Sequence, residues 1–124
     1  KLDELKLSVA EFVASNNTTP DNASSAGIGS AGGWTTVTGP KYDKAIGYQE
    51  VTNGATVMVG VQLRGNVGGI TDGLPDTLDN VELILQGAVQ TDGSLSWTCG
   101  TTAPATRVKL LPSNCRNALD ITPQ

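Results

Sequence analysis

Two stretches near the C-terminus decide the fold: SLSWTC, which spans Ser94–Cys99, and LPSNCR, which spans Leu111–Arg116. They contain the only two cysteines of the 124-residue chain, Cys99 and Cys115. The first stretch alternates polar and apolar residues as a β-strand does, and the second cysteine follows a Leu-Pro turn. We therefore expect one disulfide that closes a surface loop onto the edge of a sheet.

The number of cysteines alone also permits a reduced pair or a redox-active pair. The spacing does not fit the C-x-x-C redox motif, and two thiolates without a histidine make a weak zinc site. An oxidised pair implies a periplasmic or cell-surface location. In the chain-entropy model, closing a loop of about 15 residues contributes roughly 3 kcal/mol to stability.

Length and composition predict a single domain over residues 1–124 with one hydrophobic core. Charged residues make up only 16% of the chain, and it contains 15 glycines. This composition favours a loop-rich β or α+β domain over a helical bundle. The sequence has no run of 18 apolar residues, so it predicts no membrane-spanning helix within these residues.

The chain contains no histidine. Ser-His and Cys-His catalytic pairs are thereby excluded, and so is the commonest metal ligand. Asp76 and Asp79, with Asp72 nearby, could bind calcium, but they lack the final glutamate of an EF-hand loop, and turn chemistry explains them better. We expect no catalytic residue, no metal and no cofactor, and therefore no enzyme.

Charge is unevenly distributed along the chain. The net charge is −4. The segment from Cys99 to Arg116 contains no acidic residue and carries +3, which leaves −7 on the remainder. The three cations, Arg107, Lys109 and Arg116, are candidates for contact with receptor glycans, DNA or an acidic surface of a neighbouring subunit. The alternative is a solvated loop without a ligand.

Residues 1–15 are predicted to form a helix, because their apolar residues recur on one face. The helix has no capping residue in front of its first turn, so we expect it to continue a longer helix. Asn16 and Asn17 provide a credible end. We predict that the apolar face packs on the sheet, although it could also contact neighbouring subunits: Leu2, Leu5, Val9 and Phe12, with Val13 beside them.

The remaining segments predict an α+β fold with an N-terminal helix on a four-stranded antiparallel sheet. Residues 16–45 form a long connection that Trp34 anchors on the sheet. The sheet, residues 46–99, consists of two hairpins, the first with a type I′ turn at Asn53-Gly54 and the second around residues 91–93. A disulfide-bounded loop, residues 99–115, and an irregular tail, residues 116–124, complete the chain.

This order of elements resembles the globular part of a type IV pilin, specifically of the type IVa class of Gram-negative bacteria. The specific motifs are Trp97-Thr98-Cys99, which is similar to the family's W-x-C, and Leu111–Cys115, which is similar to its L-P-x-x-C. The apolar half of the family's N-terminal helix is absent from this sequence. Residues 117–124 continue past the second cysteine, near which some family members end.

The resemblance implies the pilin fold and a structural role as the major subunit of a pilus, in adhesion, twitching motility and sometimes DNA uptake. It also implies polymerisation with other pilin subunits, an N-methylated first residue and anchorage in the inner membrane through the absent helix half. The expected location is the extracellular pilus, with an inner-membrane pool before assembly. The domain without that helix half is expected to be monomeric.

Three alternative functions remain. A minor pilin or a type II secretion pseudopilin would share the architecture, although pseudopilins commonly lack the disulfide-closed loop. A secreted carbohydrate-binding module would need an aromatic platform, and aromatic residues make up only 4% of the chain. Trp97 is in phase with Leu95 and Cys99 along its strand, which favours packing in the core over stacking on a sugar.

Overall fold

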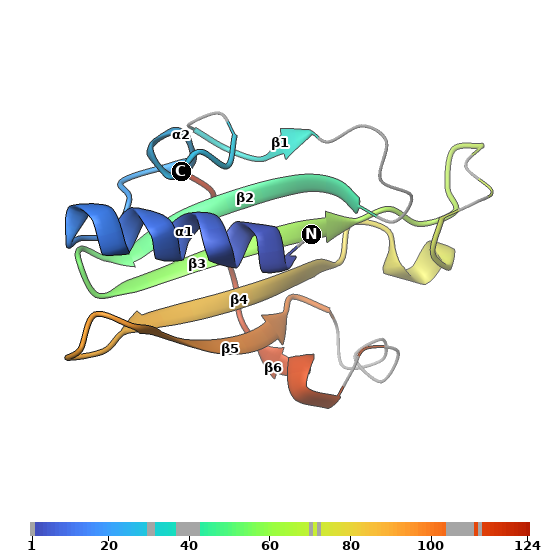
Figure 1. Ribbon diagram of the computed structural model, residues 1–124. Coiled ribbons are helices and arrows are strands. Elements are labelled where there is room, and N and C mark those ends of the chain that lie inside the picture. The colour runs from blue at the N-terminus through green and yellow to red at the C-terminus, as the bar shows by residue number, and fades with distance from the viewer. Residues whose placement is uncertain are drawn as a thin grey trace.

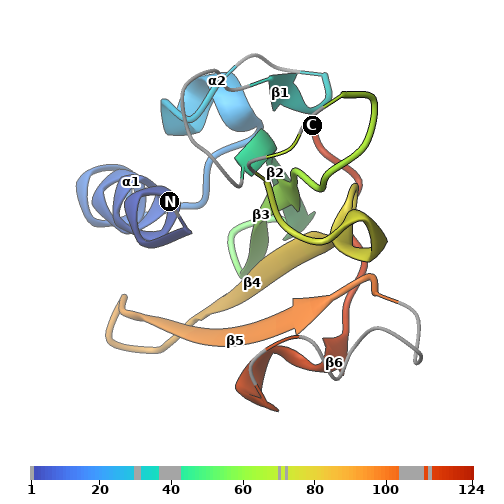
Figure 2. The ribbon, with the colours of Figure 1, turned by 90° about the vertical axis from the view of Figure 1, so that its right-hand side faces the viewer.

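The computed structural model describes residues 2–29, 32–36, 43–69, 71, 73–103, 111 and 113–124, without the side chains of residues 2, 3 and 113. One long helix lies on one face of a sheet, as Figures 1 and 2 show from two directions. The helices are α1 (Leu2–Asn16), α2 (Ala23–Ala26) and the 3-10 turns η1 (Asp76–Leu78) and η3 (Ser113–Cys115). The strands are β1 (Thr35–Thr36), β2 (Asp43–Thr52), β3 (Thr56–Leu63), β4 (Glu82–Val89), β5 (Leu95–Thr101) and β6 (Asn117–Ala118).

The predicted α+β class with a helix on an antiparallel sheet is confirmed. Four long strands, β2 to β5, pair in sequence order as two antiparallel hairpins. The sheet also gains a two-residue strand at each edge, antiparallel β1 and parallel β6. Strands of two residues contain too little alternation to be recognised from sequence, so the four-stranded prediction describes the body of the sheet.

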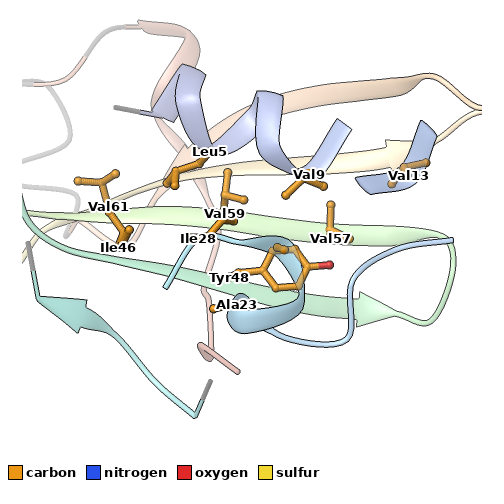
Figure 3. Packing of buried hydrophobic residues seen from close by; sticks show 11 residues of the cluster. Leu5, Val9, Val13, Ala23, Ile28, Ile46, Tyr48, Val57, Val59 and Val61 are labelled. Atoms are coloured by element: carbon orange, nitrogen blue, oxygen red, sulfur yellow. The ribbon is translucent and has the colours of Figure 1, made fainter. Parts of the chain in front are cut away.

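Helix α1 buries one stripe of branched side chains against β3. Leu5, Val9 and Val13 are buried at a spacing of four residues, and they face Val57, Val59 and other apolar side chains of the sheet (Figure 3). The helix ends as predicted, because Asn17 adopts a left-handed conformation with φ of 56° and donates its N–H to the Val13 carbonyl at 2.8 Å.

The connection between α1 and β2 contains more structure than expected. Asn22 caps the short helix α2 by accepting a hydrogen bond from the Ser25 N–H at 2.9 Å, and β1 follows. The connection is fastened to β2, because the buried Tyr48 hydroxyl donates to the Pro20 carbonyl at 2.7 Å. Such local caps and tertiary anchors explain how the described part of this connection is held in place.

The turn between β2 and β3 lies where predicted, but the type I′ assignment is wrong. A type I′ turn needs positive φ at both central residues. Gly54 has φ of 74°, whereas Asn53 is not among the described non-glycine residues with positive φ. The Ala55 N–H donates to the Thr52 carbonyl at 3.0 Å, and a glycine with positive φ at the third turn position is typical of type II.

Three glycines from different strands lie in one row on the face of the sheet opposite α1. Gly47 pairs with Gly60, Gly60 with Ile84, and Ile84 with Gly100. We call Gly47, Gly60 and Gly100, with Ile84 between them, the glycine row. Because glycine lacks a side chain, the row leaves a shallow channel over β2, β3 and β5, into which the Ile84 side chain of β4 projects.

The tail, residues 116–124, lies along this channel. Figure 1 shows it in red, passing behind the strands from β6 toward α2, and Figure 2 shows it on the side of the sheet away from α1. Leu119 lies over Gly100 and Ile121 over Gly60, and Pro123 lies over Gly47. Trp34 covers the Gly47–Gly60 end of the row, as the predicted anchoring requires.

Hydrogen bonds hold the tail at its far end. The Gln124 N–H donates to the Tyr48 carbonyl at 2.8 Å, and the Thr122 N–H donates to Gln49 Oε1 at 2.9 Å. Ile121 is buried with Met58 and Ile84 in a second core cluster, against which Trp34 and Leu119 pack. The sheet therefore has two packed faces, one under α1 and one under the tail.

Candidate functional site

The disulfide links the last long strand to the end of the chain. Cys99 in β5 and Cys115 in η3 are bonded, with a Cα–Cα distance of 4.5 Å. The predicted pairing is therefore confirmed. Immediately after it, the Asn117 side chain donates to the Cys99 carbonyl at 3.0 Å, and β6 pairs with the end of β5. The bond thus also directs the tail toward the glycine row.

Both described ends of the disulfide-bounded loop are packed on the sheet. Leu111 is buried in a third apolar cluster with Leu63, Leu78 and Val81, and Ala103 packs against the same cluster. The Thr101 hydroxyl donates to the Glu82 carbonyl at 2.8 Å. Residues 104–110 lie outside the described part of the chain.

The structure describes one of the three cations that were predicted as contact residues of this loop. Arg107 and Lys109 lie outside the described residues. Arg116 is exposed, and its Nε donates to the Leu111 carbonyl at 3.0 Å. Arg116 therefore ties the two ends of LPSNCR together, in addition to presenting a positive charge at the surface.

The predicted packing face of α1 is only partly the buried one. Leu5 and Val9 are in the core, whereas Phe12 is half-buried and the side chain of Leu2 lies outside the described part. Val13 occupies the position next to Val9 in the buried stripe. The residues of α1 that face the sheet are therefore spaced i, i+4, i+8, whereas the predicted face has a spacing of i, i+3, i+7.

A groove between α1 and β5 was not predicted from the sequence. It has a volume of about 350 Å³ and is lined by Lys6, Leu7, Ala10 and Trp97; we call it the Leu7–Trp97 groove. Trp97 lies over Gly87, where an added Cβ would be 2.8 Å from the indole ring. The ring also packs against the core cluster under α1, in agreement with the predicted core role of Trp97.

Leu7 projects from the helix into solvent beside this groove. Its side chain is 60% exposed, whereas Leu5 on the opposite side of the helix is 4% exposed. An exposed leucine is common by itself. Here it adds to the apolar part of the groove lining, which Ala10 and Trp97 also form.

The acidic residues near η1 serve the local fold. Asp79 accepts a hydrogen bond from the Gly65 N–H at 2.9 Å and forms an ion pair with Lys44 at 3.1 Å. The Gly65 N–H lowers the pKa of Asp79, and Lys44 lowers it further against the opposing effect of burial. Asp72 lies outside the described residues, and within the described part no three His, Cys, Asp or Glu residues cluster as metal ligands would.

A second groove, of about 450 Å³, lies where the tail leaves β5. Its walls include Thr102 and Asp120. Near this groove, on the face of the sheet that the tail covers, Glu82 accepts a hydrogen bond from the Gln62 side chain at 3.5 Å. Burial raises the pKa of Glu82, and the charge of Asp120 adds to this rise, whereas the Gln62 hydrogen bond opposes it.

Comparison of the sequence with models of protein families gives one match. The family model for pilin, a bacterial filament protein, matches residues 1–116. Comparison with individually curated proteins gives no match. Within the described part, every helix is too short or too polar to cross a membrane. Because the family model covers nearly the whole chain and ends one residue after the second cysteine, this chain belongs to the pilin family of bacterial filament proteins.

Proposed function

We propose that this protein is the major subunit of a type IV pilus of the type IVa class, which serves adhesion and twitching motility and can take up DNA. The observation that carries the proposal is the Cys99–Cys115 disulfide, which closes the segment after β5 onto the sheet in a chain that the pilin model matches. Minor pilins share this architecture, and pseudopilins commonly lack such a loop.

The test is deletion of the gene in the bacterium that makes the protein, followed by electron microscopy of surface filaments. Loss of the filaments, recovery on complementation, and this chain as the predominant protein in isolated filaments support a major pilin. Filaments of reduced number that contain only traces of the chain would identify a minor pilin. Surface filaments at the wild-type level together with a defect in protein secretion would identify a pseudopilin.

We further propose that the disulfide-bounded loop supplies the adhesive surface, through the positive charges of Arg107, Lys109 and Arg116. The loop is bonded at both ends, and its flanks at Ala103 and Leu111 are packed on the sheet. A partner that binds a loop tethered at both ends has less conformational entropy to remove than one that binds an untethered loop. Host-surface glycans with acidic groups and DNA are the candidate ligands.

The double substitution Arg107→Ala and Lys109→Ala tests this role. Filaments with the double substitution should bind host cells or DNA more weakly and with a smaller dependence on salt. Lys41→Ala is the control, because it removes a positive charge outside the loop. Equal binding by the double variant and the control would assign the loop a purely structural role.

A further inference from the structure

The tail packs on the glycine row through the side chains of alternate residues. Each of three apolar side chains lies over one glycine, with closest distances of 2.5, 3.3 and 2.9 Å to a Cβ atom added there: Leu119 over Gly100, Ile121 over Gly60 and Pro123 over Gly47. An extended segment turns every second side chain to the same side. The row therefore fits an extended segment that has apolar side chains at every second position.

Beyond β6 the tail crosses the strands and does not run along them (Figure 1). The Leu119 N–H donates to the Thr101 carbonyl at 3.2 Å, and the Gln124 N–H donates to the Tyr48 carbonyl at 2.8 Å. Between these points the tail is held by the packing of Ile121. The pairing of β2 to β5 involves no tail residue, so residues 119–124 can leave the row without opening the sheet.

The rest of the domain does not depend on the tail. Leu119 and Ile121 belong to the cluster of Met58 and Ile84, whereas the cluster under α1 and the third cluster contain no tail residue. The disulfide ends at Cys115, before the tail begins. Every tail residue on the row also follows the part of the chain that the pilin model matches. A subunit whose tail has left its own row therefore keeps its main core and its bonded loop.

Every copy of the chain carries both the row and the segment that fits it. Contacts that form within one subunit can therefore also form between two, and exchange of an identical segment needs no new interface. In dilute solution the subunit's own tail is favoured, because its attachment at β6 gives it a local concentration of about millimolar order. In a filament the tail of an adjacent copy has a similar advantage, since residues 119–124 span roughly 20 Å when extended.

We propose that, in the filament, the glycine row of one subunit receives residues 119–124 of a second copy of this chain. The incoming Leu119, Ile121 and Pro123 take the places over the three glycines that the subunit's own tail has left. Each subunit gives one tail and receives one, so the exchange can link successive copies in a continuing row. This inference rests on the proposed filament function.

Cysteines placed on separate copies test the exchange. A Cβ atom added to Gly47 lies 3.1 Å from Cβ of Pro123. The Cβ atoms of a disulfide are about 3.5–4.5 Å apart, so a small adjustment permits a bond. The bacterium expresses one copy with Gly47→Cys and another with Pro123→Cys, and its filaments are isolated, oxidised and separated without reductant. Neither copy can form the new bond within itself, so exchange should give a reducible dimer joined through positions 47 and 123.

The control pair replaces Gly47→Cys by Thr91→Cys, in the exposed turn between β4 and β5. Dimers from the first pair should exceed those from the control at least tenfold. The native cysteines are bonded to each other and leave no free thiol in the described part. Equal amounts of dimer from the two pairs would mean random collision of surface thiols and would overturn the exchange.

The soluble protein shows whether the bond can form when a tail lies in the row. Residues 1–124 with Gly47→Cys and Pro123→Cys in one chain should form it internally and remain monomeric. The two single variants, mixed at micromolar concentration, should stay monomeric as well. Failure of the internal bond would contradict the docking of the tail on the row and would overturn the exchange with it.

Expression of both single variants beside the wild-type chain covers the case in which they assemble poorly, because wild-type copies then build the filament. Gly60→Cys with Ile121→Cys provides a second pair, since a Cβ atom added to Gly60 lies 3.6 Å from Cγ2 of Ile121. Filaments that contain both variants of each pair without a bonded dimer would overturn the exchange and leave the filament function standing. Wild-type cells without surface filaments would instead overturn the proposed function.

Discussion

A Cβ atom added to Gly100 would lie 2.5 Å from Cδ1 of Leu119. The tail side chain therefore occupies the space that any other residue at this position of β5 would need. The same relationship recurs along the glycine row, where Ile121 lies over Gly60 and Pro123 over Gly47. The glycines of the sheet thus leave the space that the large side chains of the tail fill.

The glycine row predicts a graded response to added methyl groups. Gly100→Ala should lower the free energy of unfolding by about 1–3 kcal/mol, because the new Cβ also meets the Asn117 carbonyl oxygen at 2.7 Å. Gly60→Ala should cost less, since its closest contact is the flexible end of Ile121 at 3.3 Å. Urea denaturation of residues 1–124 measures both. Gly33→Ala, which has no atom within 4 Å, is the control, and a loss equal to that of Gly100→Ala would contradict this explanation.

The tail should contribute to stability like a core element. Ile121→Ala is expected to lower the free energy of unfolding by about 2–4 kcal/mol, because it leaves a cavity over Gly60 and Ile84. Leu7→Ala, which removes a similar side chain from an exposed position, should change it by less than about 0.5 kcal/mol. Thermal or urea unfolding distinguishes the two, and similar losses would mean that the tail is only loosely attached.

The disulfide should be present in the native protein and should stabilise it. Intact-mass measurement with and without reductant is expected to show a difference of two hydrogen atoms, because the reductant supplies two electrons and two protons follow. Replacing Cys99 and Cys115 together by serine should lower the free energy of unfolding by about 3 kcal/mol, since the unfolded loop is no longer closed. Two thiols that alkylate freely in the native sample would be incompatible with the bond.

Stability should depend on pH through Asp79. Its pKa is lowered in the folded state, so its stabilising contribution is complete above the ordinary value of 3.8 and is lost as the pH falls below it. Asp79→Ala leaves the Gly65 N–H without its acceptor and should cost about 1–3 kcal/mol at pH 7. Urea titrations at pH 7 and at about pH 3 should show a smaller difference at the lower pH. A difference that is constant with pH would exclude a role for the charge.

Residues 1–124 should be monomeric in solution. The Leu7–Trp97 groove offers a contact far below the roughly 1,000 Å² of buried surface that a stable interface needs. Light scattering should therefore give a mass near 12.7 kDa. A dimer whose proportion does not change on dilution would show that contacts within these residues suffice for association.

Features with a local sequence signal were predictable. The helix end at Asn17, both hairpins and the bond between two isolated cysteines follow from short-range patterns. The core role of Trp97 was predictable for the same reason, since it is in phase with Leu95 along one strand. The turn type at Asn53-Gly54 was not, because an Asn-Gly pair is compatible with more than one turn type.

Features that combine distant segments could not be predicted. The glycine row becomes visible only when the registers of four strands are known, because Gly47 and Gly100 are unremarkable in the sequence. The tail looks like an irregular end of the chain until that row provides a channel for it. The groove beside Leu7 depends on how α1 is rotated about its own axis on the sheet. The spacing of apolar residues in α1 does not decide between buried faces that differ by about one residue position.

The position of the tail has a consequence for the order of events in folding. Residues 119–124 cover strands that the ribosome completes earlier, and the bond from the Gln124 N–H to the Tyr48 carbonyl spans most of the chain. Until these residues emerge, the side of the sheet that bears Ile84 and Met58 faces water. Closure of that side depends on contacts between residues far apart in the chain, and contacts of this kind slow folding. A nascent subunit would carry an exposed sheet face during this interval, so it is then that a chaperone or a second nascent copy could bind.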